Sequence, residues 1–223
     1  MPDQKVPIRP RLILVDLDGT LLRINSFKFW VLYWNLFLLF QPRRWLLWVM
    51  AQLQRLSGKD DRVGMKKHLL ELYEQWQPTL SLRTQKLFIW LLWWCRRKSV
   101  HEFIMRQRKR GASIYLVTAA PDVYVMALAN KMGVEVAATT QKRKGQWFES
   151  LGENKVLATF EHLPDLTSAY HKALLITDHE DDLPLARVCD YTCLVSPSSS
   201  SREAYRRAGI RHFVFQPAVT RES

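Results

Sequence analysis

Cysteine is scarce in this chain of 223 residues, which has only three, and no two of them form a CxxC pair. The odd count and the spacing argue against a disulfide framework and against a zinc knuckle. Free thiols are typical of proteins in a reducing compartment. We therefore expect a cytoplasmic protein.

Long hydrophobic runs are also missing. The longest charge-free apolar stretch, residues 29–42, has 14 residues, whereas a membrane-spanning helix needs about 20. Arg43 and Arg44 follow it directly, and each would cost about 2.5–3.5 kcal/mol at the centre of a spanning helix. Residues 1–10 contain three prolines and no apolar run, so we expect no secretory signal. The sequence thus predicts no membrane-spanning helix, and it leaves contact with a membrane surface open.

Acidic residues are few relative to basic ones. The chain has 33 Lys and Arg against 21 Asp and Glu, which gives a net charge of +12 and a pI of about 9.8. This excess predicts an anionic partner, which is a phosphorylated substrate, an anionic membrane or a nucleic acid. A nucleic-acid-binding module is not favoured, because the basic residues alternate with apolar blocks and no recognition motif is visible.

Short apolar segments alternate with amphipathic ones over most of the chain. We expect strands at residues 11–16, 113–118, 134–140, 173–178, 191–196 and 212–215, and helices at 99–110, 121–132, 154–162 and 202–208. This alternation predicts an α/β fold in which an open parallel sheet is flanked by helices. Ligands in such folds bind at the carboxyl ends of the strands.

Residues 24–97 break the alternation and are expected to form an all-helical, tryptophan-rich cap inserted after the first strand. Residues 1–23 and 98–223 would then form the core. Eight of the nine tryptophans lie between positions 30 and 94, and residues 27–100 contain 13 Lys and Arg against four Asp and Glu. Within the cap, residues 29–41 and 87–95 are apolar on almost every side, which indicates helices buried in protein or in lipid.

The first motif that carries chemistry is Asp16-Leu17-Asp18-Gly19-Thr20-Leu21, at the end of the first expected strand. A turn that begins at Gly19 brings both carboxylates toward one pocket. Two carboxylates at close range repel each other unless a cation lies between them. The motif therefore predicts a hard divalent cation with oxygen ligands, and Mg²⁺ is the first choice.

A second motif, Leu116-Val117-Thr118-Ala119-Ala120-Pro121, ends another strand just before a helix. A hydroxyl group in this position can bond a phosphate oxygen, together with free amides at the helix N-terminus. The alternative is that Thr118 only caps the helix.

Two more candidate sites follow later in the chain. Lys155 stands near the start of an expected helix, and a lysine is a compact charge suited to phosphate; Lys142 and Lys144 compete with it for this role. The last motif, at residues 177–184, places Asp178 at a strand end and Asp182 one helical turn further on. The neighbouring Asp181 competes with Asp182, and we expect it to be exposed.

These four motifs, in this order, resemble those of the haloacid dehalogenase superfamily of phosphohydrolases. The resemblance covers residues 8–27 and 99–196 and is closest to the phosphoserine-phosphatase-like branch (subfamily IB), which has a helical C1-type cap after the first strand. In the last motif Thr177 and His179 replace the usual glycine and serine.

The resemblance implies a Rossmann-like core and Mg²⁺-dependent hydrolysis of a phosphomonoester through an aspartyl-phosphate intermediate. It makes Asp16 the nucleophile, and it makes Asp18 the acid that protonates the leaving group and then the base that activates water. The metal ligands that the resemblance implies are Asp16, Asp18, Asp178 and Asp182. The residues that it implies for phosphate binding are Thr118, Ala119 and Lys155.

The cap provides the evidence on the substrate. Asn25 stands where the phosphoserine enzymes carry a glutamate for the substrate amine, which disfavours phosphoserine itself. Aromatic residues and leucines flanked by arginines predict an interfacial anchor, and hence a lipid-linked or membrane-proximal phosphate and a peripheral position on the inner face of the membrane. The alternative is a soluble phosphatase of sugar, nucleotide or amino-acid phosphates, in which the apolar cap is a core or a homodimer interface.

Overall fold

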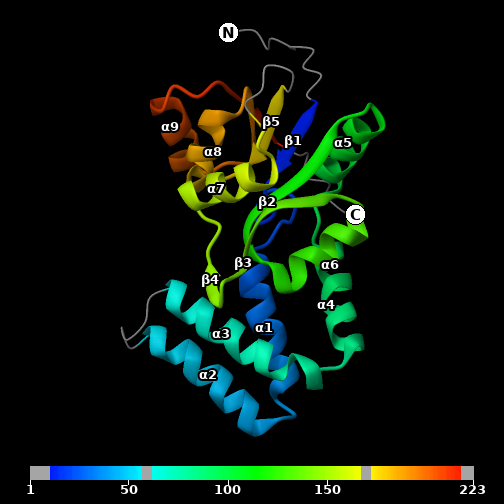
Figure 1. Cartoon of the computed structure of the whole chain (residues 1–223), viewed down its shortest axis with the longest axis vertical. Coiled ribbons are helices and arrows are strands. Elements are labelled where there is room, and N and C mark those ends of the chain that lie inside the picture. Colours follow the sequence, from blue (N-terminus) through cyan, green and yellow to red (C-terminus); the bar gives the residue numbers. More distant parts are fainter. Residues whose placement is uncertain (1–10, 57–61, 167–171, 217–223) are drawn as a thin grey trace, which may run out of the picture.

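The computed structural model describes residues 11–56, 62–166 and 172–216 (Figure 1). Its strands are β1 Leu12–Val15, β2 Ser113–Pro121, β3 Glu135–Arg143, β4 Gln146–Phe148, β5 Ala173–Thr177, β6 Tyr191–Val195 and β7 His212–Phe215. Its helices are α1 Ser26–Leu38, α2 Pro42–Leu56, α3 Arg62–Trp76, α4 Leu82–Trp94, α5 Lys98–Lys109, α6 Asp122–Met132, α7 Glu153–His162, α8 Leu183–Val188 and α9 Ser199–Arg207, with short 3₁₀ turns at Gln77–Thr79 and Glu180–Asp182.

The strands form one sheet in the order β4-β3-β2-β1-β5-β6-β7. All neighbours are parallel except β4, which runs antiparallel to β3. The central strand β1 lies between β2 and β5, with Leu12 opposite Ser113 on one side and Ala173 on the other. The carboxyl ends of these three strands are therefore adjacent, where ligands bind in open α/β sheets.

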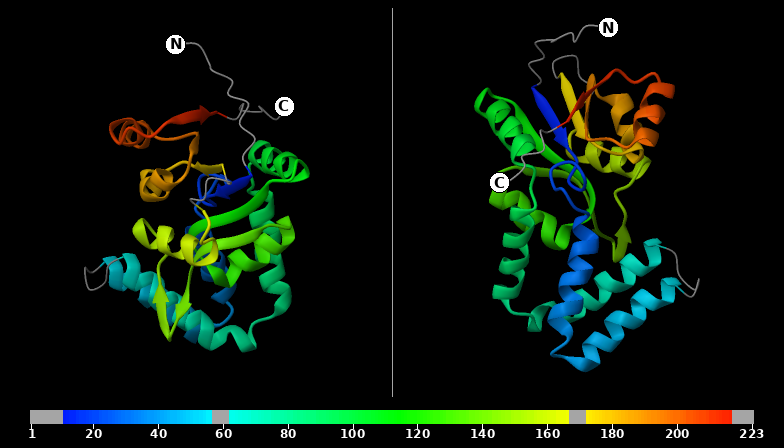
Figure 2. Two further views of the ribbon diagram at one scale, coloured as in Figure 1. Left: turned by 45° about the horizontal axis from the view of Figure 1, so that its top comes forward. Right: turned by 180° about the vertical axis from the view of Figure 1, so that it is seen from behind.

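The two faces of the sheet are covered by different helices, because alternate residues of a strand point to opposite faces. On one face Ile13 and Val15 pack with residues of α5, α6 and the cap. On the other face Leu12 and Leu14 pack with residues of α7, α8 and α9. Figure 2 shows these two helical layers on either side of the sheet.

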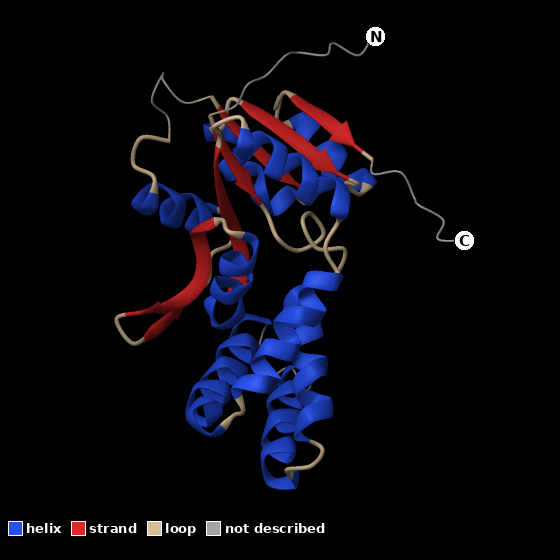
Figure 3. Cartoon of the chain, turned by 90° about the vertical axis from the view of Figure 1, so that its right-hand side faces the viewer, coloured by secondary structure: helices blue, strands red, loops and turns tan. Residues whose placement is uncertain are grey.

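Helices α1 to α4 form the cap, which extends away from the sheet and contains no strand among its described residues (Figure 3). Helix α1 contacts α2 and α4, and α2 contacts α3. Trp30 is at the centre: it is 1% exposed, and its ring centroid lies 5.2 Å from those of Trp48 and Tyr73, both edge-on. Such aromatic pairs contribute about 0.5–1.5 kcal/mol each beyond the burial of their surface.

The expected α/β fold with a helical insert is confirmed. The division at residues 24 and 97 stays a prediction, and residues 1–10 and 217–223 of the expected core lie outside the described residues. The helix expected at residues 29–41 is α1, and the block 87–95 falls mostly in α4. No helix in the described parts of the chain has the length and apolarity to cross a bilayer.

The sequence analysis missed strand β4. It pairs with β3 as a hairpin whose turn residues, Lys144 and Gly145, have φ angles of 47° and 82°. Two positive φ angles are typical of the tight turns that join antiparallel strands. The hairpin buries Trp147, which is 7% exposed. The hairpin extends from the sheet toward α3 of the cap (Figure 1).

The cap core provides a first prediction. Replacing Trp30 with alanine should lower the free energy of unfolding by about 3–5 kcal/mol, because the cavity cannot be filled by its neighbours. The control, Trp90→Ala, removes a side chain that is 48% exposed and should cost less than about 1 kcal/mol. Urea denaturation followed by circular dichroism measures both. Equal losses would contradict the described packing.

Candidate active site

The two acidic residues of the first motif, which follow β1, have different hydrogen-bond partners. The amide of Asp16 donates a hydrogen bond to the carbonyl of Ile176 (2.9 Å), which continues the pairing of β1 with β5, and the residue is 8% exposed. The Asp18 carboxylate accepts a hydrogen bond from the amide of Ser26, the first residue of α1 (2.8 Å). Helix N-termini favour anions, so the start of the cap helix holds Asp18 in place.

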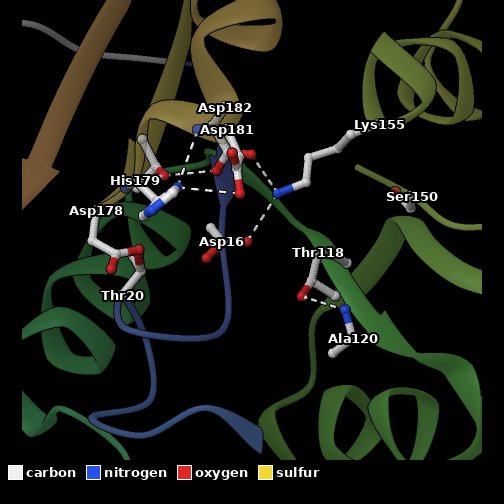
Figure 4. A network of polar contacts seen from close by, with 12 residues as sticks. Asp16, Thr20, Thr118, Ala120, Ser150, Lys155, Asp178, His179, Asp181 and Asp182 are labelled. Carbon is white, nitrogen blue, oxygen red and sulfur yellow. Dashed lines mark hydrogen bonds and ion pairs between the residues drawn. The ribbon is translucent and has the colours of Figure 1, made fainter. Parts of the chain in front are cut away.

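Lys155 connects the carboxylate that follows β1 with a carboxylate that follows β5 (Figure 4). Its Nζ donates to Asp16 Oδ1 (3.0 Å) and to Asp182 Oδ1 (2.5 Å), and its side chain is 3% exposed. The Thr177 hydroxyl donates to the other oxygen, Asp182 Oδ2 (2.6 Å). Burial acts to lower the pKa of Lys155, but the carboxylates of Asp16 and Asp182 outweigh it and raise that pKa above its ordinary value. Lys155 is therefore charged.

Asp178 follows β5 and packs against the turn after β1. Its Oδ1 accepts a hydrogen bond from the Thr20 hydroxyl (2.9 Å). A Cβ atom at Gly19 would lie 2.1 Å from Asp178 Oδ2, and the φ angle of Gly19 is +75°. Only glycine combines this φ angle with so close an approach. Gly19 thus allows the carboxylates after β1 and β5 to share one site.

Negative charge is crowded at these strand ends. Burial raises the pKa of Asp16 well above its ordinary value, Lys155 opposes this shift, and the carboxylates of Asp182, Asp178 and Asp18 add to it. Burial also raises the pKa values of Asp18 and Asp178. One lysine does not balance four carboxylates, so the site favours a further cation.

The oxygen-only donors fit a hard cation such as Mg²⁺. Within the described ranges no three His, Cys, Asp or Glu side chains converge as a ready-made cluster. Both oxygens of Asp182 are bonded to Lys155 and Thr177, which favours an orienting role for this residue. A cation beside Asp16 and Asp178 would need main-chain and substrate oxygens to complete its shell.

The second motif lies on the opposite side of Asp16 from Asp178 (Figure 4). Thr118 is 1% exposed, and its Oγ1 accepts a hydrogen bond from the amide of Ala120 (3.1 Å). Helix α6 begins just beyond, at Asp122. Residues 118–120 belong to β2, where its pairing with β3 is irregular, and we call this segment the turn 118–120. It carries the Thr118 hydroxyl on the side of Asp16 away from Asp178 (Figure 4).

The seven candidate residues lie near the carboxyl ends of β1, β2 and β5, in the 3₁₀ turn after β5 and, for Lys155, on α7. Their competitors lie elsewhere: Lys142 forms an ion pair with Glu74 (2.7 Å), Lys144 is exposed in the hairpin turn, and the Asp181 side chain is 48% exposed.

A small cavity of about 70 Å³ lies between core and cap beside these residues. Residues from both parts line it: Asp18, Asn25, Phe27, Lys28, Met65, Lys66, Ala119 and Ala120. Sequence reasoning missed Lys66, because a lysine on a basic insert helix carries no local signal of burial.

Comparisons with known proteins identify the family of the chain. The family model of haloacid dehalogenase-like hydrolases matches residues 13–187. The chain therefore belongs to this family of hydrolases, and the resemblance inferred from its four motifs is confirmed. None of the curated proteins matches the chain in sequence.

Several solved structures share the fold. A phosphoserine phosphohydrolase-like protein from Francisella tularensis has a TM-score of 0.53 at 13% identity, over 92% of this chain and 94% of that one. A predicted phosphatase from Clostridium acetobutylicum has a TM-score of 0.55 at 15% identity, over 92% and 93%. A phospho-aspartyl intermediate analogue of phosphoserine phosphatase has a TM-score of 0.52 at 15% identity, over 87% and 90%. At these identities the likeness concerns the fold.

The buried charge cluster provides a second prediction. Lys155→Met should lower the free energy of unfolding by about 3–5 kcal/mol in the absence of divalent cations, because it leaves buried carboxylates without their partner. The control Arg207→Met removes an exposed ion pair with Glu203 and should cost less than about 1 kcal/mol. Denaturant titration measures both variants. A Lys155→Met protein as stable as the wild type would contradict the described pairing.

Proposed function

We propose that this hydrolase cleaves phosphomonoesters through an aspartyl-phosphate intermediate on Asp16. The observation that carries the proposal is the buried Asp16 carboxylate, which lies between the cation-favouring side at Asp178 and the hydroxyl side at Thr118, with Lys155 on Oδ1. A carboxylate held in this way can attack phosphorus while positive groups neutralise the transferring oxygens.

The reaction has two steps. Asp16 attacks phosphorus and the bond to the leaving oxygen breaks, while Asp18 donates a proton to that oxygen. Burial raises the pKa of Asp18, which supports its role as the acid. In the second step Asp18 takes a proton from water, and the water attacks the acyl phosphate to release inorganic phosphate.

The other residues neutralise and orient. Lys155 and Thr118 contact the oxygens of the phosphoryl group, and Asp182 holds Lys155 in place. Mg²⁺ held by Asp16, Asp178 and the main-chain carbonyl of Asp18 would supply further neutralisation of the transferring group.

A third prediction tests the nucleophile. Asp16→Asn should lower kcat for an aryl phosphate with Mg²⁺ by at least about 1,000-fold, because the amide cannot form the intermediate. Asp181→Asn is the matched control, since it changes an exposed carboxylate and should keep wild-type turnover. Steady-state release of the aryl alcohol measures both. Full activity of Asp16→Asn would refute the mechanism.

We further propose that the substrate is a lipid-linked or membrane-proximal phosphate, and that the cap binds an anionic bilayer. Of the 18 large apolar side chains that are exposed among the described residues, twelve lie in the cap. We call these twelve the apolar face: Leu32, Leu36, Leu39, Phe40, Leu46, Leu47, Met50, Leu53, Leu82, Leu87, Trp90 and Trp94. Ten of them lie on α1, α2 and α4, and Leu39 and Phe40 lie in the connection between α1 and α2. So many exposed apolar residues are typical of an interaction surface.

The charge of these helices supports a bilayer as the partner. Helices α1, α2 and α4 contain six Lys and Arg and no Asp or Glu. Basic residues close to an anionic bilayer each contribute about 1 kcal/mol, and aromatic rings favour the headgroup level. A second copy of the same basic face would repel the first, which disfavours a homodimer.

Helix α1 connects this face to the site. Lys28 lines the cavity beside Asp18, and Leu32 and Leu36 follow it at intervals of four residues, 53% and 59% exposed. Residues four apart on a helix share one side. This row provides a path for an apolar chain whose phosphate end reaches the cavity.

Asn25 does not support phosphoserine as the substrate. Its Oδ1 accepts a hydrogen bond from the amide of Lys28 (2.9 Å) and caps α1. No carboxylate is then offered to a substrate amine from this position. A soluble metabolite phosphatase is the alternative outcome of the test below.

A fourth prediction tests the membrane partner. At low salt the protein should float with vesicles that contain phosphatidylglycerol and should remain unbound with neutral vesicles of phosphatidylcholine. Replacing Phe40 and Trp90 with aspartate should weaken anionic-vesicle binding by at least about ten-fold, because both apolar contacts are lost and charge is added. The control Phe213→Asp changes an exposed residue of β7, outside the cap, and should leave vesicle binding unchanged.

Two results would contradict this proposal. One is no flotation with anionic vesicles at low salt. The other is a stable dimer in analytical ultracentrifugation that the Phe40 and Trp90 substitutions dissociate, which would make the apolar face a contact between two copies.

A further inference from the structure

Lys66 is a buried lysine that the mechanism above does not use. It lies on α3 of the cap and is 6% exposed. Its Nζ donates to the carbonyl of Ala119 (2.7 Å), to Glu149 Oε1 (2.8 Å) and to Thr140 Oγ1 (3.2 Å). All three acceptors belong to the core, so this cap side chain crosses into the other part of the molecule.

We propose that Lys66 is a positioning residue that sets the orientation of the phosphate-binding turn 118–120 when the cap is in place. The inference rests on the proposed phosphatase function and adds a role for the cap in preparing the phosphate site.

Side-chain hydrogen bonds hold the turn 118–120 in place. The pairing of β2 with β3 is irregular between Val117 and Pro121, so side chains fix the carbonyls of this segment. Ala119 O accepts from Lys66 Nζ and also from the Thr140 hydroxyl (2.7 Å), and Ala120 O accepts from the Thr139 hydroxyl (2.6 Å).

The planar peptide group between Ala119 and Ala120 connects Lys66 to Thr118. The carbonyl of Ala119 and the amide of Ala120 belong to one trans peptide group, so they point in opposite directions. Lys66 draws the carbonyl toward the cap, and the amide then donates to Thr118 Oγ1 (3.1 Å). A hydroxyl that accepts this bond keeps its own proton for a second partner. Lys66 thereby orients Thr118 to donate to a phosphate oxygen.

Helix α3 of the cap is attached to the core by two ion pairs. Lys66 and Glu149 form an ion pair whose side chains are 8% and 15% exposed. Glu74 on the same helix pairs with Lys142 of β3, and these side chains are 33% and 41% exposed. Two ion pairs thus attach α3 to the β3–β4 hairpin and to the residue that follows it, but only Lys66, in the buried pair, also bonds the turn 118–120.

These two pairs provide a matched test. With an aryl phosphate and Mg²⁺, Lys66→Met should lower kcat/KM at least about ten-fold and raise the inhibition constant of inorganic phosphate by a similar factor. Lys142→Met breaks the other pair between α3 and the hairpin, and both constants should stay within about two-fold of the wild type.

A double-mutant cycle separates positioning from loss of structure. Because Lys66 acts through Thr118, the double variant Lys66→Met/Thr118→Val should have the same kcat/KM and the same inhibition constant of inorganic phosphate as Thr118→Val alone. Effects that multiply, or a Lys66→Met protein with wild-type phosphate inhibition, would overturn the proposal. If Lys66→Met fails to fold, Lys66→Gln, which removes the charge and shortens the side chain, is measured in its place; an unchanged inhibition constant of inorganic phosphate there would also overturn the proposal.

Failure of the underlying function gives a different result. A wild-type chain that neither hydrolyses the aryl phosphate nor binds inorganic phosphate contradicts the proposed function and this inference with it. If the wild type is active and Lys66→Met has the same kcat/KM and the same phosphate inhibition constant, only the proposed role of Lys66 is contradicted.

Discussion

The ion pairs of Lys155 with Asp16 and Asp182 are the interaction on which the site depends. Carboxylates that follow two neighbouring strands are buried together, and burial alone would force them to take up protons. Lys155 reaches them from α7, which packs on one face of the sheet, and keeps the cluster partly neutral. A bound cation would balance the remaining negative charge, and the same cation would attract the anionic phosphate ester to the site. Gly19 makes this arrangement possible, because a larger residue would push Asp178 away.

The cap uses its aromatic residues in two ways. Trp30, Trp34, Trp48 and Trp76 are buried and hold its helices together, whereas Trp90 and Trp94 are 48% and 67% exposed. The same composition therefore provides an interior and an apolar surface. Two cap helices contact the site. The amide of Ser26, the first residue of α1, donates to Asp18, and Lys66 of α3 donates to the carbonyl of Ala119 in the turn 118–120.

The sequence predicted the fold of the core and the family of the chain, because both follow from local patterns. Apolar strands that end in Asp16, Thr118 and Asp178 must place these residues at one edge of a parallel sheet. Other features depend on contacts between distant segments. The hairpin of β3 and β4, the burial of Lys66 and the bonds of Asp182 are of this kind, and the sequence of each segment alone does not reveal them. The division of the tryptophans into buried and exposed ones likewise required the packing of the cap.

The central claim is that Asp16 carries the phosphoryl group beside a cation. A crystal structure of the protein with Mg²⁺ and beryllium fluoride, a mimic of an acyl phosphate, tests it most directly. The account predicts beryllium bonded to a carboxylate oxygen of Asp16, with Asp178 on the metal and Lys155 and Thr118 on the fluorides. An unmodified Asp16, with the fluoride complex or the metal bound at other residues, would contradict it.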